Sequence, residues 1–276
     1  MNFYAKIKQQ LRVFFLVLAK KLGNEKPKGP IFRNSKSIIE KEIKIPAVVS
    51  FAVTVSLVYA MFVLDVGFSY FSVFASLIFT AIIAFFFILQ IKGREREILN
   101  DNDAVVLMCI LTITGILVLQ ISKEYVSAFI FPAGAFVIMS AMLLSVRVGM
   151  LYAVMMSLYA GMLSDMRFDV FFVMFCGGMA AIVNIEKVRR RSDFIMSGLT
   201  ITVVNALVIT MFYMLKGYSG DYYGDNLLYC FLNGAASTVI ILALMPLFEK
   251  LFSRITNIKL IELSDFNNPL LKRLML

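Results

Sequence analysis

The polar residues that could carry chemistry in this sequence are few, and the two clearest stand alone inside long apolar stretches. They are Asn205 in "VVNALV" and Asn233 in "FLNGAAS". A side-chain amide in such surroundings can hydrogen-bond to a neighbouring helix, or it can line a pocket for a small solute. We interpret both as helix-packing residues, with ligand binding as the alternative.

Small residues accompany these amides. Gly234 follows Asn233 directly, and Gly177 and Gly178 occur together in "FCGGMAA". Glycine has no side chain to hold two helices apart, so it allows a second backbone to come close. These positions therefore predict tight helix crossings, and ligand contact is again the alternative.

A third polar group, "SDMRFD", places Asp165, Arg167 and Asp169 together in a short segment between apolar runs. Opposite charges at this spacing can form an ion pair that fixes a turn, or they can contact a small ligand. The ion pair is the simpler interpretation, and contact with a small ligand is the alternative.

Several classes of chemistry are excluded by what the 276 residues contain. There is no histidine, which excludes a histidine general base and a His–Asp metal centre formed within this chain. Neither a glycine-rich phosphate loop nor a nucleophile beside a base is present. The three cysteines lie in apolar runs without metal or redox spacing: Cys109, Cys176 and Cys230. We therefore expect no cofactor, no metal and no enzymatic activity from this chain as given.

The elements that must position these residues are transmembrane helices. The chain is 60% hydrophobic and only 16% charged, and apolar runs of about 18 residues or more are typical of membrane-spanning helices. The sequence predicts an all-α polytopic membrane bundle of about eight transmembrane helices, at residues 47–64, 71–91, 104–122, 128–146, 148–163, 168–185, 194–215 and 226–248.

The distribution of basic residues orients these helices. With the N-terminus inside, the outer loops contain Lys123, Arg167 and Lys216, and every other Lys and Arg falls on the inner side. This asymmetry agrees with the positive-inside rule, and it requires a hairpin at "SVRVG" around Arg147. Both termini are then cytoplasmic. Arg189, Arg190 and Arg191 form an inner basic patch, which either sets topology alone or also contacts a partner or lipid.

Residues 1–46 form a basic cytoplasmic segment that precedes the leading transmembrane helix, 47–64. Apolar residues recur there at helical spacing with lysines and arginines around them. This pattern predicts an amphipathic helix on the anionic inner leaflet, the alternative being a basic tail that only sets topology. The net charge of +9 therefore indicates the lipid bilayer as the partner, and no nucleic acid.

Two stretches of the sequence resemble a known family. They are "GMLSDMRFDVFFVMFCGGMAAIVNIEKVRRRSDFIMSGLTITVVNALVI" and "FLNGAASTVIILALMPLFEKLFSRITNIKLIELSDFNNPLLKRLML". They resemble the membrane region of the seven-transmembrane HD family, which are bacterial receptors with an intracellular HD hydrolase. The resemblance implies a leading helix, an extracytoplasmic domain, seven further helices and an HD domain. It also implies hydrolysis of cyclic di-AMP by that domain, with a metal pair held by His and Asp.

The sequence departs from the family at both places where a further domain is expected. Only "DVGFSY" separates the first two predicted helices, and the chain stops after "NNPLLKRLML". We therefore expect a seven-helix module at 71–248 and a cytoplasmic connector at 249–276 that would lead into an HD domain. Leu270, Leu271 and Leu274 form an apolar stripe in this connector and are the predicted output contacts.

The expected function is that of a sensor or anchor module of a cyclic-di-AMP phosphodiesterase signalling system in the bacterial inner membrane. An HD hydrolase would be its partner, in trans or in a longer native chain, and a homodimer would be compatible with the sequence. The alternative is a small-solute binding or transport protein, such as the substrate subunit of a vitamin importer, with Asn205 and Asn233 lining the pocket.

Overall fold

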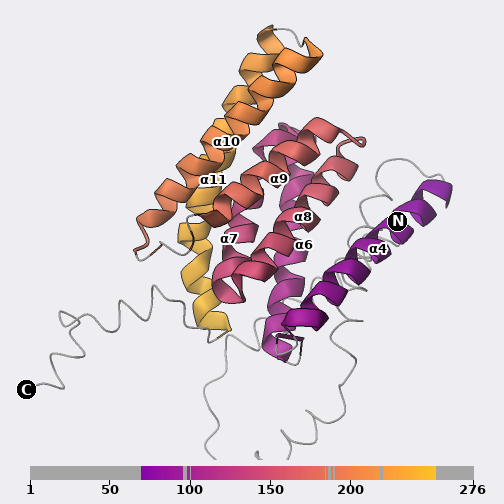
Figure 1. Ribbon diagram of the computed structural model, residues 1–276, viewed down its shortest axis with the longest axis vertical. Helices are drawn as coiled ribbons and strands as arrows, with labels where there is room; N and C mark the ends of the chain where they lie inside the picture. The colour runs from indigo at the N-terminus through magenta and orange to yellow at the C-terminus, as the bar shows by residue number, and fades with distance from the viewer. Residues whose placement is uncertain are drawn as a thin grey trace, which may run out of the picture. The chain divides into compact units, whose positions relative to one another are not determined.

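The computed structural model describes residues 70–95, 98–99, 101–183, 185, 188, 190–217 and 220–252, and within them every regular element is a helix (Figure 1). The predicted leading helix at 47–64, the amphipathic segment before it and the connector after residue 252 lie outside the described residues. The described helices, in chain order, are α4 (Tyr70–Arg94), α6 (Asn102–Tyr125), η1 (Ala128–Ile130), α7 (Ala133–Leu143), α8 (Val146–Leu163), α9 (Phe168–Val183), α10 (Asp193–Lys216) and α11 (Gly220–Leu251).

These helices coincide with seven of the eight predicted apolar runs, so the all-α fold is confirmed. Two of the helical segments, 128–143 and 168–183, are shorter than a typical span. The predicted total of eight spans and the cytoplasmic position of both termini stay predictions. Among the described residues, five helical segments are long and apolar enough to cross a membrane: Phe74–Arg94, Asp103–Tyr125, Val146–Leu163, Asp193–Lys216 and Tyr222–Leu251.

Two local signals decide where the middle helices begin and end. Pro132, which has no N–H to donate, separates the 3₁₀ turn η1 from α7. Ser145 adopts an extended conformation and its hydroxyl accepts a hydrogen bond from Val148 N at 3.3 Å. This cap separates α7 from α8, which is the interruption predicted at "SVRVG".

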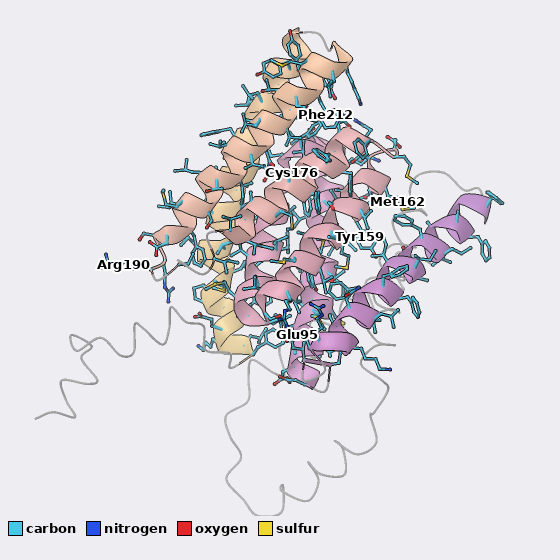
Figure 2. The ribbon with its side chains drawn as sticks, viewed as in Figure 1. Glu95, Tyr159, Met162, Cys176, Arg190 and Phe212 are labelled. Carbon is cyan, nitrogen blue, oxygen red and sulfur yellow. The ribbon has the colours of Figure 1, made fainter. Side chains whose placement is uncertain are left out.

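Because successive helices run in opposite directions, the connections gather at two ends of the bundle. We call them the Arg167 end, with the connections 126–132, 164–167 and 217–219, and the Arg147 end, with the connections 95–101, 144–145 and 184–192. Figure 2 shows Glu95 at the Arg147 end and Phe212 near the Arg167 end. The charge pattern predicts that the Arg147 end is cytoplasmic.

Helix α8 lies in the core, and one of its side chains, Tyr152, contacts both α6 and α4. Tyr152 is fully buried, and its hydroxyl donates to the carbonyl of Met108 at 2.6 Å and pairs with the Thr112 hydroxyl at 2.9 Å. Its ring also meets Phe87 of α4 edge-on, with the centroids 5.4 Å apart. One side chain therefore connects α8 to both α6 and α4.

Candidate functional site

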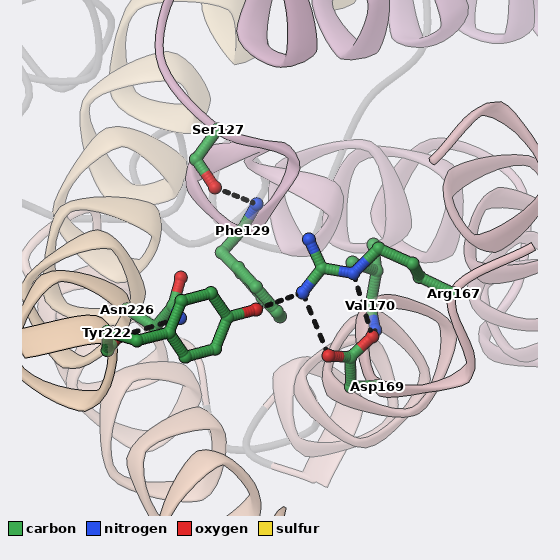
Figure 3. A network of polar contacts seen from close by, with 7 residues as sticks. All are labelled: Ser127, Phe129, Arg167, Asp169, Val170, Tyr222 and Asn226. Carbon is green, nitrogen blue, oxygen red and sulfur yellow. Dashed lines mark hydrogen bonds and ion pairs between the residues drawn. The ribbon is translucent and has the colours of Figure 1, made fainter. Parts of the chain in front are cut away.

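The turn between α8 and α9 holds an arginine and an aspartate against each other (Figure 3). Arg167 Nε and Nη2 donate to the two carboxylate oxygens of Asp169 at 3.2 and 2.8 Å. The Asp169 side chain is 3% exposed and that of Arg167 is 40% exposed. Asp169 Oδ1 also accepts a hydrogen bond from Val170 N at 2.9 Å, in the first turn of α9, where a negative charge is favoured.

The ion pair considered for "SDMRFD" is therefore present, but Asp165 is not part of it. Asp165 and Met166 both have a φ of 58°, in the left-handed region that L-residues seldom adopt. This conformation reverses the chain between the two helices within a few residues. Asp165 is left exposed, while Arg167 returns over the bundle.

The guanidinium of Arg167 also contacts two aromatic residues from other elements (Figure 3). It donates a hydrogen bond to the hydroxyl of Tyr222 in α11, and its Cζ lies 5.2 Å from the ring centroid of Phe129 in η1. Burial disfavours the charged form, but the hydrogen bond and charge of Asp169, together with Tyr222, raise the pKa of Arg167 above its usual value. Arg167 therefore stays charged at any working pH.

We call Arg167, Asp169, Tyr222 and Phe129 the Arg167 cluster. Its remaining supports are local: the Ser127 hydroxyl accepts a hydrogen bond from Phe129 N at 3.3 Å and caps η1. Tyr222 and Phe129 were not identified from the sequence, because they lie 55 and 38 positions from Arg167 and carry no charge to mark them. The cluster joins the α8–α9 turn, η1 and the start of α11.

The same 3₁₀ turn is contacted a second time by α11, through Asn233. The side-chain amide of Asn233 donates to the carbonyl of Phe129 at 3.0 Å and to that of Phe131. Asn233 is 1% exposed, and its two acceptors belong to the turn before α7, so the amide joins two separate elements. Its partners are backbone atoms next to Pro132, which could not be identified from the spacing of polar side chains.

Asn205 is buried like Asn233, but its surroundings differ. A Cβ placed on Gly177 of α9 would come within 2.3 Å of Asn205 Oδ1, so the amide lies against the bare backbone of that glycine. Asn205 Oδ1 has no hydrogen-bond partner among the described residues. Gly178 lets α9 approach α8, since a Cβ there would be 3.1 Å from that of Ala153. A solute pocket at these positions stays an alternative prediction.

Helices α10 and α11 cross at two facing pairs of small residues. A Cβ on Gly198 would lie 1.9 Å from Thr238 Oγ1, and one on Gly234 would lie 2.0 Å from Thr202 Oγ1. Each helix therefore presents a glycine followed four residues later by a threonine to its neighbour. Only Gly234 was identified from the sequence, although the repeated Gly-x-x-x-Thr spacing is a signal that would have indicated the whole crossing.

The other predicted site residues lie apart from the Arg167 cluster. Arg190 and Arg191 are exposed at the Arg147 end, whereas Arg189, Leu270, Leu271 and Leu274 fall outside the described residues. Arg191 and Glu249 line a small hollow beside Pro246 of α11. Glu249 is only 5% exposed and was not identified from the sequence. The predicted roles of the arginines and leucines stay predictions.

The polar contacts of Arg167 and Asn233 hold several elements against one another. Arg167 bonds to Tyr222 of α11, and Asn233 of α11 bonds to the turn before Pro132. These contacts connect the Arg167 end to α11, which runs to the other end of the bundle (Figure 1). Within the described residues, no group of three His, Cys, Asp or Glu side chains could hold a metal ion.

The sequence of this chain matches one protein family and two curated proteins. A family model described as "7TM receptor with intracellular HD hydrolase" matches residues 70–256. The chain is 24% identical over 212 residues to the cyclic-di-AMP phosphodiesterase PgpH of Bacillus subtilis, covering 72% of this chain and 29% of that protein. It is 23% identical over 195 residues to PgpH of Listeria monocytogenes, covering 68% of this chain and 27% of that protein.

The chain thus spans less than a third of the length of the curated relatives that it matches. No solved structure matches it. The matched stretch begins with α4 and continues past the end of α11. This match and the long apolar helices together support a multi-pass membrane protein.

Proposed function

Because the chain belongs to the family of 7TM receptors with an intracellular HD hydrolase, we propose that it is the membrane module of a cyclic-di-AMP phosphodiesterase signalling system. Its task is to control an HD hydrolase from the bilayer. Two PgpH relatives named as cyclic-di-AMP phosphodiesterases support this substrate. The proposal places the module in the bacterial inner membrane, with the Arg147 end towards the cytoplasm.

The observation that carries the proposal is the double attachment of α11. Tyr222 connects the start of this helix to Arg167, and Asn233 connects it to the carbonyls beside Pro132. A change at the Arg167 end therefore alters the position of a helix 32 residues long. The last residues of that helix, 249–251, begin the predicted connector 249–276, so α11 is the element that would carry the change to a hydrolase.

The hydrolytic centre itself must come from other residues. An HD centre binds its metals through histidine and aspartate, and these 276 residues contain no histidine. The hydrolase is then supplied either by a longer polypeptide or by a separate protein. We assign its docking to the connector, with Leu270, Leu271 and Leu274 as the apolar contacts and Arg189, Arg190 and Arg191 as a basic patch nearby.

A chimera tests this function. In the B. subtilis PgpH, the stretch that matches this chain is replaced by residues 70–256, and the protein is expressed in cells that lack their own cyclic-di-AMP phosphodiesterases. Membranes with the chimera should hydrolyse cyclic di-AMP at a rate comparable to that of the parent. The control replaces the same stretch with unrelated transmembrane helices of the same topology, and it should lose that rate.

Two outcomes would contradict the proposal. One is a chimera that reaches the membrane in the parent's amount and hydrolyses no cyclic di-AMP. The other is an unrelated anchor that supports the same hydrolysis, because these helices would then contribute only attachment. The docking assignment has its own test. The triple variant Leu270→Asp, Leu271→Asp and Leu274→Asp should abolish co-purification with an HD hydrolase expressed beside the full chain.

A further inference from the structure

A furrow separates α4 from α8 on the side of the bundle. It encloses about 380 Å³ and its walls are almost wholly apolar, formed by Phe79, Ile82 and Phe86 of α4 with Val154, Met155 and Leu158 of α8. Ile82 and Phe86 are 49% and 60% exposed, while Phe87 at the floor is 4% exposed and packs on Tyr152. The described side chains that form its rim are therefore exposed, and the contact between the Phe87 and Tyr152 rings lies beneath them.

At the Arg147 end a second hollow of about 170 Å³ lies beside the furrow. The two hollows share Gln90 and Leu151 in their walls, and the second adds charged side chains to walls that are otherwise largely apolar. Arg94 and Arg147 line the hollow, and so does Glu95. Arg147 Nη1 lies 3.4 Å from Glu95 Oε1, with side chains 62% and 25% exposed respectively.

The charges of this hollow favour an anion. Among the described residues that line the hollow there are two guanidinium groups and one carboxylate, an excess of one positive charge, and the exposed pair is weak enough to rearrange around a ligand. Guanidinium groups bind phosphate through two parallel N–H···O contacts. A phosphate at the end of a long apolar furrow is the chemistry of a phospholipid, whose acyl chain and headgroup are joined in the same order.

We propose that the furrow between α4 and α8 binds an acidic phospholipid of the bilayer, with an acyl chain against Ile82, Phe86 and Val154 and the headgroup phosphate between Arg94 and Arg147. The charge complementarity selects an anionic lipid over a zwitterionic one, as in other basic hollows between transmembrane helices. The bound lipid completes the contact between α4 and α8. This site is independent of the proposed coupling to a hydrolase.

Native mass spectrometry tests the site. The full chain is released from nanodiscs that contain equal amounts of phosphatidylglycerol and phosphatidylcholine, and the lipids that stay bound are identified. The chain should retain one phosphatidylglycerol preferentially. Replacing both Arg94→Gln and Arg147→Gln should lower its retention by about tenfold or more. Lys250→Gln, which removes another exposed basic residue at the same end but outside the furrow, should leave retention unchanged.

A second variant tests the apolar half of the site without changing its charge. Val154 is 40% exposed and lines the furrow, so Val154→Phe should fill the space and also lower phosphatidylglycerol retention. Equal retention of the two lipids by the wild-type chain would overturn the proposal, because it would show non-selective contact. Unchanged selectivity in the double arginine variant and in Val154→Phe would place the lipid elsewhere.

Discussion

The side-chain amide of Asn233 donates a hydrogen bond to the backbone carbonyl of Phe129, a residue 104 positions earlier in the chain. This carbonyl belongs to the 3₁₀ turn before Pro132, where regular helical hydrogen bonding is interrupted. The amide thus supplies a donor that the local backbone lacks. In a membrane, where water cannot take this place, such a bond fixes α11 against the turn.

The first prediction concerns this bond. Asn233→Ala leaves the carbonyls of Phe129 and Phe131 without the amide donor, and we expect a loss of about 1–3 kcal/mol in the free energy of unfolding. Reversible unfolding in mixed micelles measures it. Asn205→Ala is the matched control, because it removes a second buried side-chain amide, one that lies against the backbone of Gly177. Equal losses in both variants would show that the amide contributes only packing.

The second prediction concerns the ion pair. Arg167→Gln leaves the buried carboxylate of Asp169 without its guanidinium, and the expected loss is about 2 kcal/mol, reduced from the value for a fully buried pair because Arg167 is partly exposed. Arg147→Gln removes the more exposed pair with Glu95 and should cost about 0.5 kcal/mol. Thermal unfolding of the two variants in one detergent makes the comparison, and a similar cost for both would refute it.

The third prediction concerns the crossing of α10 and α11. Gly234→Ala would place a methyl group 2.5 Å from the carbonyl oxygen of Gly198, so the two helices must separate and the chain should lose about 1–3 kcal/mol of stability. Gly224→Ala in the same helix meets nothing within 4 Å and should be stabilising by up to about 1 kcal/mol. A neutral or stabilising effect of Gly234→Ala would mean that the two helices lie further apart at this crossing than the structure shows.

The fourth prediction concerns Gly177 and Asn205. A methyl group at Gly177 would overlap the Asn205 side chain, so Gly177→Ala should destabilise the chain. The double variant with Asn205→Ala should regain most of the loss, since the second substitution removes the overlapping atoms. A double-mutant cycle with an interaction energy of about 0.5 kcal/mol or more is expected. Strict additivity would show that α9 and α10 do not meet at this point.

Much of the fold followed from apolar periodicity and charge asymmetry alone. Seven predicted runs coincide with helices, and the hairpin near Arg147 was placed correctly because a single arginine interrupts a long apolar stretch. Pro132 lies at the break between η1 and α7, because a residue without an N–H interrupts regular helical hydrogen bonding. These signals are local, because each depends on only a short stretch of the sequence.

The partners of the site could not be predicted in the same way. Arg167 and Asp169 are neighbours in sequence and were identified together, but Tyr222 and Phe129 reach them only through the packing of three helices. Asn233 was recognised as a packing residue, yet its acceptors are backbone carbonyls, which every residue carries. The furrow between α4 and α8 is likewise formed by ordinary apolar residues whose pairing depends on tertiary structure.

The central claim is that α11 carries changes in the membrane helices to a hydrolase. The most direct test measures cyclic-di-AMP hydrolysis by chimeras in which one of the two contacts that attach α11 is removed. We expect Arg167→Gln and Asn233→Ala each to change the rate per inserted chimera by about fivefold or more. Gly224→Ala, which contacts nothing in α10, should leave it unchanged. If all three variants hydrolyse cyclic di-AMP at the rate of the unmodified chimera, the account is contradicted and the helices serve only as an anchor.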